Sequence, residues 1–248
     1  MKKILFLGLL VFLAAALWQL PLSIVKPYAE KYVAGLKINE ASGTVWKGEA
    51  QQLIANNTNF EKVKWTVKPL ASLTSLSLKF DFDIEGRDLT AKGLAGLTPN
   101  KNLIIEDTTF TLNARYLNKQ QRFARLSGDI SGNINHATLN QRDLPMIDGI
   151  IDWKEAAVTS PIKLAKGDYH AVVTPDADKL NIQLTSSDAP VELSGKITLN
   201  KEWMYNTDLN IKASDPTIAP MMGLLGRAQA DGAVNIKRKG DLKPFIGK

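Results

Sequence analysis

The strongest constraint on the fold is an alternation of apolar and polar residues that repeats with a period of two along most of the chain. Because successive side chains of a β-strand point to opposite faces, each such segment predicts a strand with one apolar and one polar face. Strands of this kind belong to antiparallel sheets with one solvated face, and not to the parallel sheets of α/β proteins. The clearest segments span residues 62–68, 76–84, 109–114, 126–134, 180–184, 191–199 and 203–211.

Turn-forming residues separate these segments. Short stretches rich in Pro, Gly, Asn and Asp predict hairpin connections at residues 98–100, 166–168, 175–178 and 187–190. Counted in this way, the chain has about a dozen strands. Few helices are expected: a brief one within residues 26–36, and a short one from Asp215 to about Leu225. The predicted class is therefore all-β, with a mainly antiparallel sheet.

So few helices leave the apolar face of the sheet without an obvious cover. A soluble domain does not tolerate a large, flat and exposed apolar face. The sheet therefore either packs or closes on itself, or curls into a gutter with an apolar lining. The alternation of residues leaves both arrangements open.

An uncharged run of 22 residues, from Ile4 to Val25, follows two lysines at the N-terminus. As a helix it would be about 33 Å long, enough to cross a bilayer core of ~30 Å. A cleaved signal peptide is the alternative, because small residues at 14–16 follow a short apolar core. A retained anchor is favoured, since apolar residues continue past that point and Trp18 and Tyr28 suit the membrane interface.

Residues 1–25 are accordingly interpreted as a short cytoplasmic end and a transmembrane anchor, and residues 26–248 as a β-rich domain outside the cytoplasm. Lysines flank the apolar run on both sides in nearly equal number, but a long domain after a signal-like start is translocated largely regardless of charge. The bacterial inner membrane, with a single pass and the C-terminal domain in the periplasm, is the simplest location. A periplasm tolerates proteins without Cys.

Composition excludes most enzyme classes. The absence of Cys rules out disulfides, thiolate metal sites and thiol nucleophiles. The two histidines, His136 and His170, have no metal ligands at suitable spacing, and a polar surface explains both. Asp81 and Asp83 share one strand face, where a solvated surface explains them better than an acid–base pair. No catalytic residues, metal sites or cofactors are therefore predicted, and the chain is not expected to be an enzyme.

A Ser-Gly pair recurs at the start of predicted strands, at residues 42–43, 127–128 and 194–195. The first two glycines precede a tryptophan, Trp65 or Trp153, by 22 and 25 residues. The recurrence is consistent with two repeated sheet units, at about residues 36–125 and 126–248. Bulges or close backbone approaches that recur by chance explain it equally well.

Several stretches of the sequence carry a resemblance to a known family. Residues 41–48 read Ala-Ser-Gly-Thr-Val-Trp-Lys-Gly, and residues 63–69 read Val-Lys-Trp-Thr-Val-Lys-Pro. Together with residues 193–199 and 220–226, they resemble the type II secretion system protein N family (general secretion pathway protein N). The resemblance implies an inner-membrane protein with a periplasmic β-rich domain, an accessory part of a machine that exports folded proteins across the outer membrane. It also implies an architecture similar to AsmA-like envelope proteins, and hence a curved, elongated and partly open sheet.

No catalytic residues are known for that family, so the candidate residues are structural. Glycines in the motif are expected to let a strand bend or bulge, and its tryptophans are expected to pack near that bend. The motif residues singled out are Gly43, Trp46, Gly48, Trp65 and Pro69.

A basic cluster near the C-terminus is the candidate interaction site, formed by Lys237, Arg238 and Lys239. Anionic lipid head groups or an acidic partner would suit it, and a loose polar terminus is the alternative. Nucleic acid is not expected as a partner, because export removes access to it.

Two functions follow from these observations. The first is a non-enzymatic scaffold of type II secretion, whose partners are other components of the secretion system and the inner membrane that its N-terminal helix would span. The second is an AsmA-like envelope protein that binds or transfers lipid through an apolar groove in the sheet.

Overall fold

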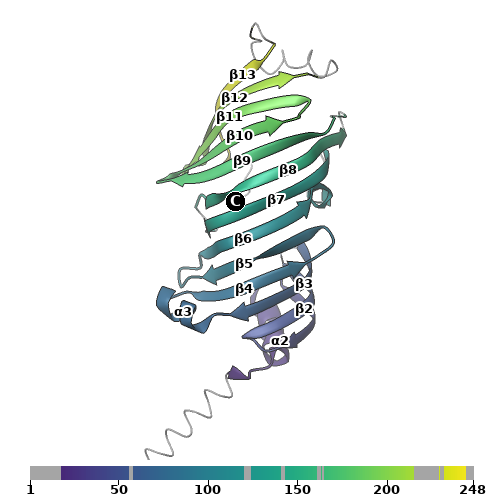
Figure 1. The fold of residues 1–248 in the computed structure, drawn as a ribbon. Coiled ribbons are helices and arrows are strands. Elements are labelled where there is room, and N and C mark those ends of the chain that lie inside the picture. Colours follow the sequence, from purple (N-terminus) through teal and green to yellow (C-terminus); the bar gives the residue numbers. More distant parts are fainter. Residues whose placement is uncertain are drawn as a thin grey trace, which may run out of the picture. The chain divides into compact units, whose positions relative to one another are not determined.

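The computed structural model describes residues 18–55, 58–119, 124–140, 143–160, 163, 165–214, 229 and 232–243. The chain divides into two compact units, Met1–Gly96 and Leu97–Lys248, and each is described by itself. The described residues form thirteen strands, whose neighbours within each unit pair antiparallel, together with short helices (Figure 1). The predicted all-β class, with about a dozen mainly antiparallel strands, is confirmed.

The first unit begins with a helix and continues as a sheet whose strands lie in chain order. Cross-strand pairs of β3 and β4 place apolar side chains on one face, for example Trp65 opposite Phe82 and Val63 opposite Ile84. The elements are α2 (Leu22–Tyr32), β1 (Lys37–Gly43), β2 (Lys47–Ala55), β3 (Thr58–Val67), α3 (Pro69–Ser75), β4 (Leu78–Glu85) and β5 (Leu89–Leu97).

The helices of this unit differ in part from those expected. Helix α2 overlaps the helix expected within residues 26–36 but begins and ends earlier. Helix α3 was not predicted, and Leu76, assigned above to a strand, instead caps α3 in a left-handed conformation with φ 50°. That assignment is wrong because Pro69–Ser75 form α3, Leu76 is its C-cap, and the strand begins at Leu78.

The predicted membrane span, residues 4–25, lies mostly outside the described residues, as does the helix expected from Asp215 to Leu225. Within the described part of the chain, no helix combines the length and the apolar character that a bilayer crossing needs.

The second unit is a sheet that also follows the order of the chain. The turns predicted at 175–178 and 187–190 overlap the connections between consecutive strands. The one predicted at 166–168 is displaced, because residues 167 and 168 pair within β9 and only Lys166 lies in the connection. The elements are β6 (Leu103–Asn113), the 3-10 helix η1 (Ala114–Lys119), β7 (Arg125–Leu139), β8 (Met146–Ser160), β9 (Gly167–Asp176), β10 (Lys179–Ser187), β11 (Val191–Asn200), β12 (Met204–Ala213) and β13 (Val234–Asp241).

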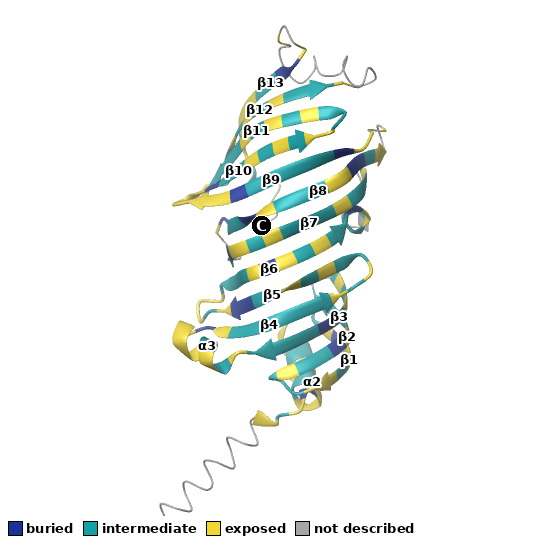
Figure 2. Cartoon of the chain, viewed as in Figure 1, coloured by how far each residue is buried: buried dark blue, intermediate teal, exposed yellow. Residues whose placement is uncertain are grey.

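Burial is shallow along the strands of both units (Figure 2). Half of the buried apolar residues are alanines, and most large apolar side chains on the strands are only half-buried. Compact clusters form around Leu144, Val173 and Leu180, and around Val234. Among the described residues, contacts run almost entirely between strands adjacent in sequence, so no second layer packs on either sheet.

Candidate functional site

The glycines and one tryptophan of the family motif meet at the β1–β2 turn of the first unit. Gly43 lies opposite Gly48, and Gly48 lies opposite Trp65 on β3. The indole N–H of Trp65 donates a hydrogen bond of 3.1 Å to the carbonyl oxygen of Val45. A Cβ on Gly48 would lie 2.5 Å from the Trp65 ring, so glycine is needed for the ring to cross the strand.

Trp46 and Pro69 lie at the same end of this sheet. The backbone N–H of Val67 donates to the carbonyl of Trp46 at 2.7 Å, and Pro69 begins α3 directly after β3. The Trp46 ring stacks on that of Trp18, with centroids 5.7 Å apart. The five motif residues therefore gather at one end of the sheet.

A second glycine–tryptophan pair, in the other unit, uses the same chemistry. The indole N–H of Trp153 donates to the carbonyl of Ser127 at 3.1 Å, beside Gly128. All three glycines of the recurrent Ser-Gly pairs have positive φ: 89° at Gly43, 104° at Gly128 and 144° at Gly195. The Ser-Gly pairs thus mark local backbone conformations that favour glycine. The repeat of whole sheet units stays a prediction.

Replacing Trp65 with phenylalanine removes the indole donor but keeps a ring. We expect Trp65→Phe to lower the free energy of unfolding by about 0.5–1.5 kcal/mol, the usual net value of one hydrogen bond. Trp153→Phe should cost a similar amount, whereas Trp18→Phe, at an exposed ring, should stay within ~0.5 kcal/mol. Urea denaturation measures all three, and an unchanged Trp65→Phe would show that the bond contributes nothing.

The second unit presents a continuous row of apolar side chains across β8–β13. In β11 and β12, the residues that point to this face are half-buried. The residues between them point to the other face and are mostly exposed. The polar face carries hydrogen-bonded pairs such as Asp152 with His170, at 2.7 Å, and Asn235 with Asp208, at 3.0 Å. Registered positions define what we call the apolar face: Ile151, Ala171, Val173, Ile182, Leu184, Ile197, Leu209 and Ile236.

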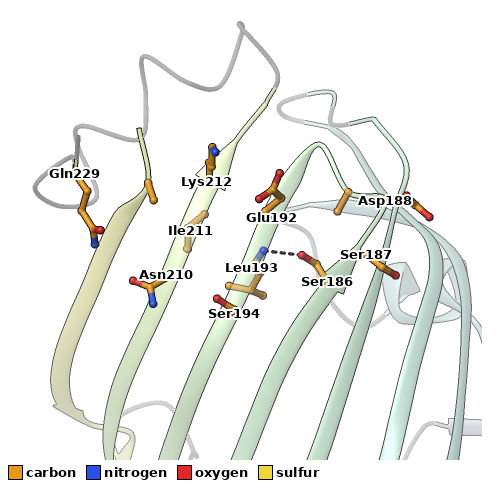
Figure 3. A pocket seen from close by; sticks show the side chains of 12 residues that line it. Ser186, Ser187, Asp188, Glu192, Leu193, Ser194, Asn210, Ile211, Lys212 and Gln229 are labelled. Atoms are coloured by element: carbon orange, nitrogen blue, oxygen red, sulfur yellow. Dashed lines mark hydrogen bonds between the residues drawn. The ribbon is translucent and has the colours of Figure 1, made fainter. Parts of the chain in front are cut away.

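One end of the apolar face opens into a pocket of about 800 Å³ (Figure 3). Leu193 and Ile211 line it from the apolar face, while Glu192 and Lys212, which pair across β11 and β12, carry opposite charges and belong to the polar face of the same strands. The backbone N–H of Leu193 donates to Ser186 Oγ at 2.7 Å. The pocket therefore lies at the ends of these strands and is lined by residues of both faces.

The basic cluster lies on β13, where the alternation of the strand divides it. Lys237 is opposite Asp208 and Arg238 is opposite Thr207, so neighbouring basic residues point to opposite faces. Lys237 Nζ lies 3.3 Å from Asp208. The pKa of Asp208 lies below its usual value because Asn235 and Lys237 donate hydrogen bonds to its carboxylate. The three residues form part of a paired strand.

The polar face of the first unit is a network of exposed ion pairs. Glu85 binds Lys62 at 2.6 Å and also Lys64, and Lys68 lies 2.7 Å from Asp81. Asp83 lies opposite Lys64. These partners indicate that the carboxylates belong to a solvated surface.

Acid should weaken this network at Glu85. Hydrogen bonds from Lys62 and then Lys64 lower the pKa of its carboxyl to about 2, from an ordinary value of 4.5. Because the folded pKa is depressed, the stabilisation is complete above the unfolded pKa and is lost as pH falls through about 2. We expect NMR titration to give a Glu85 midpoint near 2 that rises in Lys64→Gln and in high salt but not in Lys37→Gln. A midpoint at the ordinary value would contradict the ion pairing.

The histidines lie apart. His136 contacts Thr138 at 3.2 Å and lies 3.9 Å from Glu106, while His170 pairs with Asp152. Within the described ranges, no group of three or more His, Asp or Glu side chains is placed to hold a metal ion.

Sequence reasoning missed an exposed leucine patch on α3, formed by Leu70, Leu73 and Leu76, which are 81%, 74% and 78% exposed. Spacing by three residues after Pro69, which suits the first turn of a helix, is the signal that could have revealed it.

Comparisons with known proteins agree with the motif at the β1–β2 turn. The family model described as "Type II secretion system (T2SS), protein N" matches residues 34–237. A curated "Type II secretion system protein N" from Pectobacterium carotovorum subsp. carotovorum is 22% identical over 219 residues, which cover 84% of this chain and 85% of the relative. The Klebsiella pneumoniae protein of the same name is 22% identical over 251 residues, with 97% of each chain covered. No solved structure matches the chain at a significant level. Because the family model spans most of its length, the chain belongs to the type II secretion system protein N family.

Proposed function

We propose that the chain is a non-enzymatic scaffold of type II secretion, anchored in the bacterial inner membrane, with residues 26–248 in the periplasm. Membership of the protein N family supports a role in the secretion system. The uncharged run that begins at Ile4 supports the anchor. Because Leu20 and Leu22 already belong to the folded first unit, roughly 17 residues remain for the bilayer, the lower end of the usual range of about 17–25.

The apolar face of the second unit is the observation that carries the scaffold role. It extends over six strands, its large side chains are mostly half-buried, and no second layer of described residues covers it. Extended apolar surfaces in soluble domains mark sites of interaction. Such a face binds a partner segment over several strands, and the partner we propose is another component of the secretion machinery.

Lipid binding is a second candidate function, favoured by the pocket at the end of the apolar face. An acyl chain would lie along residues such as Leu184 and Leu209 and extend toward Leu193 and Ile211 at the pocket. This candidate rests on the curved, partly open sheet that the AsmA-like resemblance implies.

Complementation tests the scaffold role. In a strain that lacks the gene, the full-length chain should restore a secreted protein to the medium and should fractionate with the inner membrane. A chain whose run from Ile4 is interrupted by charged residues should remain stable but fail to restore secretion. Normal secretion without the gene would overturn the proposal. Phospholipid that co-purifies with the full-length chain, and is lost in Leu184→Asp, would favour the second candidate.

A further inference from the structure

Helix α3 turns its polar side chains toward the sheet and its leucines toward solvent. Its serine side faces the sheet: Ser72 Oγ donates to the Lys68 carbonyl at 2.7 Å and accepts the Lys79 N–H at 2.9 Å. Ser75 pairs with the buried Ser77 at 2.7 Å. Surface helices normally turn their apolar side to the core, so the outward leucine patch has no role in packing this unit.

Backbone conformation supports the same orientation. Leu76 ends α3 in the left-handed region, with φ 50° and ψ 34°, and is 78% exposed. A left-handed residue is a common helix ending, and here the Leu76 N–H closes α3 on the Ser72 carbonyl while its side chain stays in solvent. No charged residue lies within α3 (Pro69–Ser75).

The leucine patch lies at the end of the sheet where the N-terminal run enters the structure. The backbone N–H of Val45, in the β1–β2 turn, donates to the Leu20 carbonyl at 3.2 Å, and Trp18 stacks on Trp46. Val67, which leads into α3, donates to the Trp46 carbonyl. Trp18, itself 59% exposed, therefore shares this end with α3. The uncharged run covers all of the chain between Lys3 and Trp18.

We propose that the leucine patch and Trp18 insert into the interfacial region of the phospholipid bilayer, so that this end of the first unit rests on the membrane. The inference rests on the anchoring included in the proposed function. A chain that leaves the bilayer near Trp18 brings this end of the sheet to the head groups, where tryptophan is favoured. Leucines without flanking charge gain apolar contact there, as on interfacial helices. At the same end, Lys68 is paired with Asp81, and the exposed Lys47 would meet anionic head groups.

Site-specific labelling tests this contact, because the chain contains no Cys. Full-length Leu73→Cys and Val33→Cys are each labelled with an environment-sensitive fluorophore and reconstituted into phosphatidylethanolamine–phosphatidylglycerol vesicles that carry nitroxide acyl chains. Val33 is the matched control, since it is 52% exposed and lies near the start of β1, at the opposite end of the sheet. Leu70→Cys repeats the test at a second position.

We expect several-fold stronger quenching at positions 73 and 70 than at position 33. Vesicle-bound protein with unquenched label at both patch positions would overturn the inference and leave the anchor intact, and the patch would then face water or a protein partner. Equal quenching at position 33 would also overturn it, as a sign of non-specific adsorption. Failure of the chain to enter vesicles would overturn the inference and the anchoring together, whereas loss of the secretion role would show only in complementation.

Discussion

Gly43→Val should lower both the stability and the cellular abundance of the protein, with secretion falling in proportion. Gly43 has φ 89°, and a Cβ there would lie 2.6 Å from the Lys47 carbonyl oxygen and 3.0 Å from the Gly48 Cα. Neither neighbour is a flexible side chain, so the β1–β2 turn must distort. We expect a loss of about 1–3 kcal/mol in the free energy of unfolding, a large part of the ~5–15 kcal/mol of a domain.

Two alanine variants separate the cost of a positive φ from the cost of a steric clash between the added Cβ and the backbone. Gly232 has φ 81° with no atom within 4 Å of a built Cβ, so Gly232→Ala carries the backbone strain alone. Gly43→Ala should therefore destabilise more than Gly232→Ala. Because strands contact mainly their sequence neighbours, hydrogen exchange should rise in β1–β3 and little elsewhere. Wild-type stability and abundance of Gly43→Val with failed secretion would contradict this account and mark the turn as a docking surface.

Leu184→Asp should abolish most secretion while leaving much of the fold intact. Leu184 lies on the apolar face between two small residues, Ala171 and Gly195, and is half-buried. A carboxylate there would be desolvated by any apolar occupant and would block its binding. In the free protein the remaining exposure limits the cost, which we expect to be about 1 kcal/mol.

Gln183→Asp is the matched control, since Gln183 is exposed on the polar face beside Lys196. It should retain normal secretion and stability. Thermal unfolding and quantified abundance establish whether Leu184→Asp fails through folding. A folded, abundant Leu184→Asp protein with normal secretion would show that the apolar face has no functional occupant.

The strands could be predicted because one face of each is polar. In β11 the half-buried positions alternate with exposed ones from Val191 to Ile197, as the period of two requires. Helix α3 could not be predicted in the same way, because Leu76, Leu78 and Phe80 also fit a strand. The hydrogen bonds of Ser72 to the sheet side and the exposure of the leucines show that the leucines face outward.

The candidate site was predictable in its residue types but not in its geometry. Trp46 and Trp65 were expected to pack near a bend. The hydrogen bond from the Trp65 indole to the Val45 carbonyl depends on register, as does that from Trp153 to the Ser127 carbonyl. Likewise, a run of basic residues in the sequence does not show that Lys237 and Arg238 point to opposite faces of a sheet. Their orientation follows from the pairing of β13 with β12. Interactions set by strand pairing are nonlocal, and local sequence patterns do not encode them.

Photo-crosslinking from the apolar face tests the central claim most directly. A benzophenone amino acid is placed at position 184, on the apolar face, or at position 183, on the polar face, and secreting cells are irradiated. If the apolar face binds a secretion component, position 184 should form a discrete adduct with that component and position 183 should not. An adduct with lipid would show that the apolar face is a binding surface but that it binds lipid, the second candidate function. Adducts at position 183 alone, or none at 184 in cells that secrete normally, would contradict the account.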